Sequence, residues 1–537
     1  MCIKGVNYRM QKKGIEPEYN IEINPAYEIE RLLLFGRRHG LIGRLDAVIA
    51  RNQLLEALQI QEPYSGEIEA EALKYPTEIL DRLVAYAQAA GLCDKDSYTA
   101  GELFDTRLMG FLMPRQTEIE SRFDQLRESK SVESATDYFY ELCTASNYIR
   151  TAAIEKNIQW TANTRYGGLE ITINLTKPEK DPAQIAKERL LPVSGYPKCM
   201  LCLENIGYPG RSNFPARQTH RIIPVTLCGE QWYLQYSPYV YYSEHCIVFS
   251  ERHEPMKISE MTFSMLLDFV RQFPHYICGS NADLPIVGGS ILSHNHFQGG
   301  RQLFPMHKAP VIRQFTWEEF KGLDIALVKW PLSVIRVAGD NIEELSRFCT
   351  RVLGEWRQYS DSSAEILAAS QAEGSLVPHN TITPIARLNE AGKYELDLVL
   401  RNNRTTVEYP EGLFHPHRDI HHIKKENIGL IEVMGLAILP GRLKTELEML
   451  REILCGRAEI SSISREDSVL FKHSQWIDEL ASRYELPLGD AEAEELLKQE
   501  TGKKFETCLE HAGVFKQTPE GIAAFERFMK TLGCQSK

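Results

Sequence analysis

Gly288-Gly-Ser-Ile-Leu-Ser-His-Asn-His-Phe-Gln-Gly-Gly300 is the stretch of this 537-residue chain that predicts both its fold and its chemistry. His294, His296 and Gln298 occupy every second position, and on a β-strand such residues point to the same face. Glycine pairs stand at both ends, where the missing Cβ would let a ligand approach the backbone. The stretch therefore predicts a strand that presents polar side chains to one site.

The segments around this stretch predict a unit of strands and a helix that occurs twice. Ahead of the histidines, the spacing of apolar residues indicates strands at 232–240 and 245–249 and a helix at 259–273. After them a similar order returns, with a strand at 334–337, a helix at 342–356 and strands at 381–385 and 394–400. We therefore predict an α+β fold with a duplicated core.

Both ends of the chain are predicted to be helical. Apolar residues three and four positions apart indicate helices at 28–35, 45–58, 77–90 and 135–153, and the first clear strand is 169–175. From Pro440 onward helices return. The predicted regions are a helical 1–165, a first half-core 166–310, a second half-core 311–445 and a helical 446–537.

The composition excludes several classes of protein. Hydrophobic residues make up 43% and charged residues 25%, which is typical of a soluble globular protein. The formal net charge of −12 argues against a nucleic-acid or membrane-surface binder, because either would need a basic face. No apolar run of about 18 residues predicts a membrane span, and the N-terminus lacks a signal-peptide pattern. We expect a cytoplasmic protein with reduced thiols.

A pair of cysteines indicates a metal site. Cys199 and Cys202 form a Cys-x-x-Cys pair, which needs two further ligands to complete a tetrahedral zinc site. A redox role is less attractive, because no thioredoxin-like strand and helix follow. His253 and His294 would supply two imidazoles, and a site with four protein ligands would be structural.

His296 is the candidate nucleophile. A neutral imidazole attacks phosphorus well near pH 7, and the bond that it forms can be attacked by a second acceptor. Gln298 cannot ionise, but it can donate a hydrogen bond to a phosphoryl oxygen. Backbone amides near Gly288 and Gly289 could donate in the same way.

The ordered set of these residues resembles the histidine-triad superfamily, and within it the nucleotidyltransferase branch, since the hydrolase branch has a third histidine where this chain has Gln298. Longer stretches resemble the bacterial class II galactose-1-phosphate uridylyltransferases, and the resemblance spans most of the chain. These stretches are 196–202, 235–242, 280–290, 379–387, 398–403 and 423–435.

The resemblance implies a core of histidine-triad-like antiparallel sheet and a double displacement. UDP-glucose would donate its uridylyl group to His296 and release glucose 1-phosphate, and galactose 1-phosphate would then take the group and leave as UDP-galactose. Gln298 would hold the transferred phosphoryl group, and Asn281 and Ser290 would contact phosphate. The four zinc ligands would be Cys199, Cys202, His253 and His294. The resemblance also suggests a homodimer, and no nicotinamide, flavin or ATP is needed.

Basic residues near these motifs are candidates for binding the anionic substrates, because phosphates need cations and forked donors. We expect at least two of them to reach phosphate, with Arg217 and Lys425 preferred. The candidates are Arg211, Arg217, Arg401, Arg404, Lys424 and Lys425.

A second histidine cluster leaves a second metal site open. It comprises His415, His417, His421 and His422, and on a strand His415 and His417 would share a face. No carboxylate partner is evident in the sequence. The alternative is contact with sugar hydroxyls or with solvent.

Two other functions stay open at this stage. A nucleotide-sugar phosphorylase or a hydrolase of the same superfamily would use orthophosphate or water as the acceptor, although Gln298 disfavours the hydrolase. A zinc-stabilised binding module without catalysis would keep the four metal ligands but would have no use for His296 and Gln298.

Overall fold

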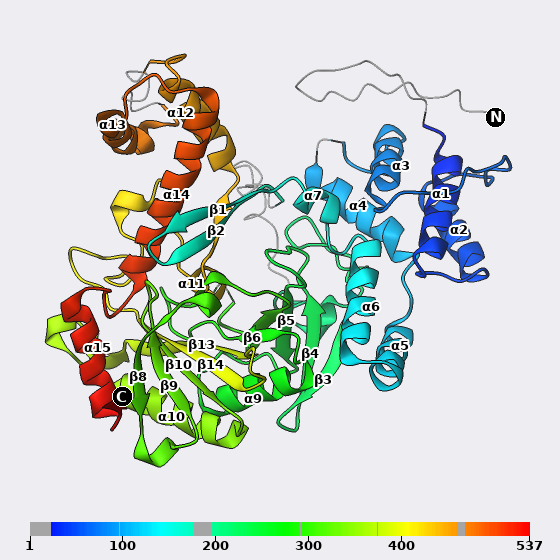
Figure 1. Ribbon diagram of the computed structural model, residues 1–537. Coiled ribbons are helices and arrows are strands. Elements are labelled where there is room, and N and C mark those ends of the chain that lie inside the picture. The colour runs from blue at the N-terminus through cyan, green and yellow to red at the C-terminus, as the bar shows by residue number, and fades with distance from the viewer. Residues whose placement is uncertain (1–22, 96, 177–194, 290, 373, 460–467) are drawn as a thin grey trace. The chain divides into compact units, whose positions relative to one another are not determined.

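The computed structural model (Figure 1) describes residues 23–95, 97–176, 195–289, 291–372, 374–459 and 468–537. Helices and antiparallel sheet are both present, so the predicted α+β class is confirmed. The chain divides into two compact units. The first comprises Met1–Glu155, Lys180–Val225 and Tyr233–Val240, and the second comprises Lys156–Glu179, Thr226–Trp232 and Tyr241–Lys537.

The first unit is largely helical, as predicted. In its first helix Ile29, Leu32 and Leu33 are buried at the expected spacing. One helix was predicted at 135–153, and this was wrong: α6 ends at Ala145, and Asn147 then adopts a left-handed backbone with φ 55°. The helices are α1 (Pro25–Arg38), α2 (Asp46–Ala57), α3 (Thr77–Ala89), α4 (Tyr98–Gly110), α5 (Gln116–Ser129), α6 (Val132–Ala145) and α7 (Thr151–Ile154).

A large sheet carries the histidine stretch. Its strand order is β16-β8-β9-β10-β14-β13-β6-β7-β5-β4-β3. The strands are β3 (Ile223–Leu227), β4 (Glu230–Tyr236), β5 (Cys246–Ser250), β6 (Ile277–Gly279), β7 (His296–Gly300), β8 (Val311–Thr316), β9 (Asp324–Val328), β10 (Val334–Gly339), β13 (Asn380–Leu388), β14 (Tyr394–Asn402) and β16 (Gln535–Ser536). β4 ends earlier than predicted, and Pro238, which has no N–H for a ladder bond, follows shortly after.

The strand order repeats, as a duplicated core predicts. Read outward from the β6–β13 pair, one side is β6-β7-β5-β4-β3 and the other is β13-β14-β10-β9-β8. Helix α9 (Glu260–Gln272) joins β5 to β6, and α10 (Ile342–Gln358) joins β10 to β13 at the same point of the order. The two helices pack against each other and against β13 (Figure 1).

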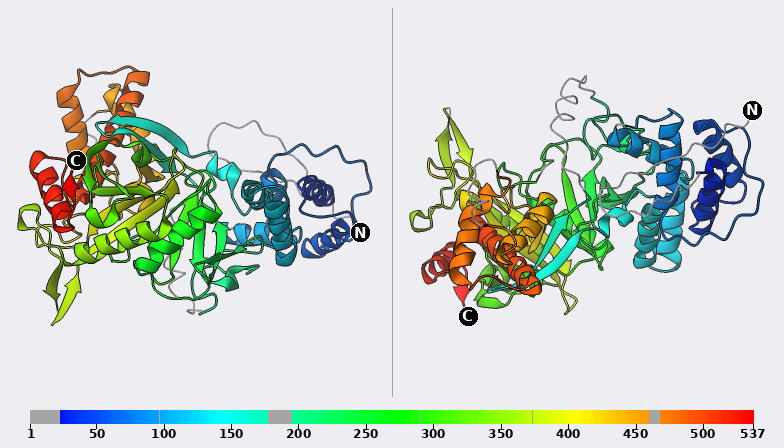
Figure 2. Two further views of the ribbon diagram at one scale, coloured as in Figure 1. Left: turned by 60° about the horizontal axis from the view of Figure 1, so that its bottom comes forward. Right: turned by 90° about the horizontal axis from the view of Figure 1, so that it is seen from above.

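A smaller sheet and the C-terminal helices complete the second unit. The smaller sheet has the strand order β1-β2-β15. Its strands are β1 (Ile158–Thr164), β2 (Gly167–Asn174) and β15 (Leu436–Pro440). β2 confirms the strand predicted at 169–175, whereas β1 was missed. The long helix α14 (Asp490–Ala512) lies along β1 and β2 (Figure 2). The other elements of this region are α11 (Leu430–Val433), α12 (Arg442–Leu454), α13 (Ser474–Arg483) and α15 (Pro519–Thr531).

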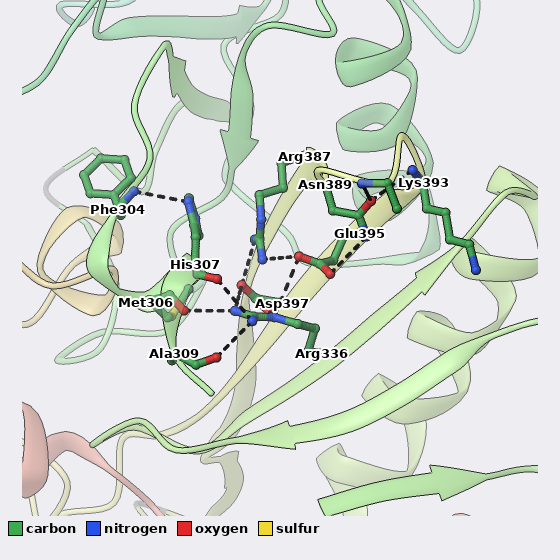
Figure 3. A network of polar contacts seen from close by, with 11 residues as sticks. Phe304, Met306, His307, Ala309, Arg336, Arg387, Asn389, Lys393, Glu395 and Asp397 are labelled. Carbon is green, nitrogen blue, oxygen red and sulfur yellow. Dashed lines mark hydrogen bonds and ion pairs between the residues drawn. The ribbon is translucent and has the colours of Figure 1, made fainter. Parts of the chain in front are cut away.

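A buried ion network ties three strands of the second half of the sheet together (Figure 3). Asp397 on β14 is fully buried, and its two carboxylate oxygens lie 2.7 Å from Arg336 Nε on β10 and 2.7 Å from Arg387 Nη1 on β13. Burial alone would raise the pKa of Asp397, but the two guanidinium groups outweigh it and hold that pKa well below its usual range. Arg387 also pairs with Glu395.

In the described part of the chain, no helix is both long enough and apolar enough to cross a membrane.

Candidate active site

β7 presents His296 and Gln298 on one face of the sheet. It pairs antiparallel with β5 on one side and with β6 on the other. A Cβ built on Gly299 would lie 3.6 Å from Phe269 of α9, so position 299 faces the helices. Because side chains alternate along a strand, His296 and Gln298 face the opposite side, as the two-residue period predicted.

His296 is held as a neutral imidazole with one nitrogen committed. Its side chain is 6% exposed, and its Nδ1 lies 2.8 Å from the backbone carbonyl of His294. Nδ1 therefore carries the hydrogen and donates it, which leaves the lone pair on Nε2. Burial lowers the pKa of His296 to about 4, so the ring is uncharged at neutral pH. This is the protonation state that a nucleophilic imidazole needs.

The connection from β6 to β7 is closely packed around Asn281. Asn281 is buried, and its Oδ1 accepts a 2.9 Å hydrogen bond from the backbone N–H of Leu430, the first residue of α11. A Cβ on Gly289 would lie 2.6 Å from Asn281 Nδ2, and one on Gly288 would lie 2.7 Å from two backbone carbonyl oxygens. The chain's own packing thus already requires both glycines.

His294 lies outside the strand, which separates its role from that of His296. β7 begins only at His296, and His294 is in the bend before it. Its side chain is buried, and its Nε2 lies 2.8 Å from the carbonyl oxygen of Ser250. With the hydrogen on Nε2, the lone pair is on Nδ1, which suits metal binding, because ligating histidines usually donate their other N–H to such an acceptor.

The four predicted metal ligands form one group. The ligand atoms of Cys199, Cys202, His253 and His294 all lie within 4.8 Å of one another, and this cluster could bind a metal. The two Sγ atoms are 3.6 Å apart. Two thiolates at about 2.3 Å from a tetrahedral zinc would stand about 3.8 Å apart, so the donor set and its spacing fit zinc.

Comparisons with known proteins agree with this site. The family described as galactose-1-phosphate uridyl transferase matches with its N-terminal domain over residues 44–255 and its C-terminal domain over residues 269–465. A galactose-1-phosphate uridylyltransferase of Caldanaerobacter subterraneus is 54% identical over 95% of this chain and 98% of its own length. The chain belongs to the galactose-1-phosphate uridyl transferase family. Proteins of the same name from Halalkalibacterium halodurans and Bacillus subtilis are 50% and 46% identical, each over 94% of this chain and 98% of the relative. No solved structure matches the chain.

In this member of the family, the basic residues predicted to bind phosphate differ in their burial and in their partners. Arg401 on β14 is 1% exposed, donates to the carbonyl of Ile428 over 2.8 Å, and has its pKa lowered to about 10 by burial. Lys424 is buried in an ion pair with Glu432 at 3.0 Å, so its charge is already neutralised. Lys425 is exposed.

The remaining arginine candidates, Arg211, Arg217 and Arg404, contact neighbouring side chains or backbone carbonyls of the protein. Arg211 donates to Asn213 Oδ1 over 2.7 Å and to the hydroxyl of Tyr208 over 2.8 Å. Arg217 lies over the ring of Tyr148, 5.7 Å from its centre. Arg404 donates to the carbonyl of Glu365 over 2.6 Å. Phosphate contacts by any of these residues stay predictions, as does the role of Ser290, which lies outside the described residues.

The second histidine cluster is not on a strand. His415 Nδ1 and Nε2 lie 3.0 Å and 3.2 Å from the carbonyl of Pro416 and from Asn427 Oδ1, and His417 stacks between the rings of Tyr409 and His511. His421 Nε2 lies 2.9 Å from the Pro416 carbonyl, and His422 packs edge-on against His473. In the described chain these histidines belong to no group of three or more metal-ligating side chains.

Sequence reasoning missed two contributors to the site. Leu430 at the start of α11 fixes Asn281, and His245 at the head of β5 lies 3.1 Å from Gln298 through its Nε2 and Gln298 Oε1. The only sequence signal for His245 was its place in the stretch before His253, because the contact depends on how β5 pairs with β7.

Proposed function

We propose that this protein is a UDP-glucose–hexose-1-phosphate uridylyltransferase that passes UMP from UDP-glucose to galactose 1-phosphate. The observation that carries the proposal is His296, buried and neutral, with Nδ1 bonded to a carbonyl and Nε2 left with its lone pair. Family membership and the names of the relatives support the choice of substrates.

The first half-reaction forms a bond between His296 Nε2 and the α-phosphorus of UDP-glucose. The bond from that phosphorus to the bridging oxygen breaks, and glucose 1-phosphate leaves with the electron pair. In the second half-reaction a phosphate oxygen of galactose 1-phosphate attacks the same phosphorus. The P–N bond breaks, its electron pair returns to Nε2, and UDP-galactose leaves, so the enzyme is regenerated without another cofactor.

Gln298 and the backbone of the glycine turn would hold the phosphoryl group during both steps. Gln298 lies two residues along the strand from His296 on the same face, and its amide can donate to a non-bridging oxygen. Asn281, Gly288, Gly289 and Ser290 are the proposed neighbours on the other side of the phosphate. Arg217, Arg211, Arg401 and Lys425 are the proposed cationic contacts.

The metal in this proposal is a structural zinc. Cys199, Cys202, His253 and His294 would hold it, and with four protein ligands it would leave no position for substrate. Its contribution would be to fix the bend at His294, whose carbonyl accepts the hydrogen bond from His296. A second metal near His415 and His417 is not part of the proposal.

Isotope exchange tests the double displacement. Labelled glucose 1-phosphate is expected to enter UDP-glucose in the absence of any galactose 1-phosphate, because transfer of the uridylyl group from UDP-glucose to His296 is reversible. A transferase that needs both sugars bound together would show no such exchange, and that result would overturn the mechanism. Release of UMP into water, or of UDP with orthophosphate as acceptor, at rates above transfer to galactose 1-phosphate would favour the hydrolase or the phosphorylase.

Three broader predictions accompany the proposal. We propose a cytoplasmic enzyme, which the reduced thiols and the phosphorylated substrates favour. We propose a homodimer, which light scattering can test. The four regions 1–165, 166–310, 311–445 and 446–537 stay a proposed description of the chain, and the repeated strand order supports the two central ones.

A further inference from the structure

His245 is placed to control Gln298. It stands directly before β5, is 3% exposed, and packs against the ring of Tyr242 with 4.5 Å between ring centres. Its Nε2 lies 3.1 Å from Oε1 of Gln298 on the neighbouring strand. A buried imidazole thus contacts the oxygen end of the Gln298 amide, which the proposed mechanism uses to hold the phosphoryl group.

The backbone beside His245 is held in an unfavourable conformation. Glu244 has φ 53°, in the left-handed region that residues other than glycine rarely adopt. Its buried carboxylate accepts a 2.5 Å hydrogen bond from the Tyr276 hydroxyl and lies 3.1 Å from Arg301 Nε. Strain of this kind persists only where the surroundings enforce it, and it occurs preferentially at functional sites.

The orientation of an amide decides what it can offer a phosphate. The oxygen and nitrogen ends of glutamine have nearly the same shape, but only the nitrogen end can donate to a phosphoryl oxygen. A hydrogen on His245 Nε2 donates to Gln298 Oε1. In the reverse orientation the ring N–H would face the NH2 group of Gln298, and two donors facing each other are unfavourable.

We propose that His245 is a positioning residue that fixes the amide of Gln298 with its nitrogen end toward the transferred uridylyl phosphate. Glu244, held by Tyr276 and Arg301, sets the backbone that aims His245. The inference rests on the proposed function and extends it, since it assigns a role to a side chain that does not touch substrate.

Three substitutions at one position separate the hydrogen bond from the bulk of the ring. His245→Gln keeps a donor near the place of Nε2, His245→Asn keeps an amide whose donor falls short, and His245→Leu removes the donor. In single turnovers with UDP-glucose, the rate of uridylylation is expected to fall about 10- to 100-fold in the Leu and Asn variants. His245→Gln should stay within about threefold of wild type, because it restores the donor.

A double-mutant cycle tests whether His245 acts through Gln298. In a Gln298→Ala background, His245→Leu is expected to cause no further loss, because the amide that it orients is gone. His473→Leu serves as a control for losing a buried imidazole: His473 is fully buried and bonds Glu446 in the C-terminal helical region. The uridylylation rate of the folded His473→Leu variant should equal that of wild type.

The outcomes are distinct. Equal losses in the Gln, Asn and Leu variants, or additive losses in the double mutant, would show that His245 supports only the fold and would overturn the inference. If His245→Leu does not fold, the comparison of His245→Gln with His245→Asn decides the matter. If wild type itself forms no adduct with UDP-glucose, the proposed function fails, whereas an adduct on wild type with unimpaired variants removes only the role of His245.

Discussion

At the scale of single residues, the two-residue period of the histidine stretch predicted that His296 and Gln298 share a face, and the structure confirms it. The same period predicted that His294 would lie beside them. His294 lies elsewhere, because the strand begins at His296 and the bend before it turns His294 toward Ser250. The local sequence pattern predicts which side chains of a strand share a face, but it does not predict where the strand begins.

Gly289 gives a prediction that depends on packing alone. In Gly289→Ala the new methyl group would meet Asn281 at 2.6 Å, and Asn281 is fixed by Leu430. We expect a loss of about 1–3 kcal/mol in the free energy of unfolding, measured by urea denaturation, together with slower uridylylation. The matched control is Gly354→Ala on α10, where a Cβ meets nothing within 4 Å. It should be neutral or stabilising by up to about 1 kcal/mol. Equal stability of the two variants would contradict the packing described for Asn281.

Gln298 gives a prediction about chemistry. Gln298→Ala keeps His296 but removes the proposed donor to the phosphoryl group. By comparison with the loss of one oxyanion donor, we expect the rate of uridylylation to fall by a factor of about 10²–10³. Rapid-quench single turnovers measure this rate directly. A variant with the wild-type rate would show that the phosphate is held by other groups.

At the scale of elements, the principal strands and helices around the histidine stretch were predictable, because their apolar spacing is regular. The ion network of β10, β13 and β14 was not. Arg336 and Asp397 are 61 positions apart in sequence, and their contact follows from strand pairing. The only local signal was a charged residue between buried leucines in Leu396-Asp397-Leu398. The contact between His245 and Gln298 was unpredictable for the same reason.

The network predicts a large stability effect at Asp397. Asp397→Asn leaves Arg336 and Arg387 buried without their shared carboxylate (Figure 3). We expect a loss of about 3–5 kcal/mol in the free energy of unfolding at pH 7. The control is Glu526→Gln, which breaks the more exposed pair with Arg313 and should cost at most about 1 kcal/mol.

Wild type and Asp397→Asn are also predicted to differ in how their free energy of unfolding depends on pH. The folded-state pKa of Asp397 is depressed, so its stabilising contribution is complete above the unfolded pKa and is lost as the pH falls toward the folded value. The stability difference between wild type and Asp397→Asn should stay constant from about pH 7 to pH 5 and shrink below about pH 4. A difference that grew on acidification would contradict the assigned sign.

At the scale of the whole molecule, the predicted class and the repeated order of strands both follow from patterns visible in the sequence. The four members of the cysteine and histidine cluster could be named as well, because a Cys-x-x-Cys pair needs two further ligands to complete a tetrahedral zinc site. The strand β1 was missed, since its residues are only partly buried and its pattern is weak.

The metal cluster predicts a joint loss of zinc and stability. Cys199→Ala removes one of four ligands, so we expect less than stoichiometric zinc by atomic emission and a lower midpoint of thermal unfolding, because zinc binding contributes to folding. Cys228→Ala, at an exposed cysteine outside the cluster, should keep both values. Full zinc content at unchanged stability in Cys199→Ala would show that the cluster is not the metal site.

The most direct test of the central claim is intact-mass measurement after brief incubation with UDP-glucose. We predict that wild type gains the mass of one uridylyl group and loses it again on addition of galactose 1-phosphate. His296→Asn should bind UDP-glucose without gaining mass. No adduct on wild type, or the same adduct on both proteins, would contradict the assignment of His296 as the nucleophile.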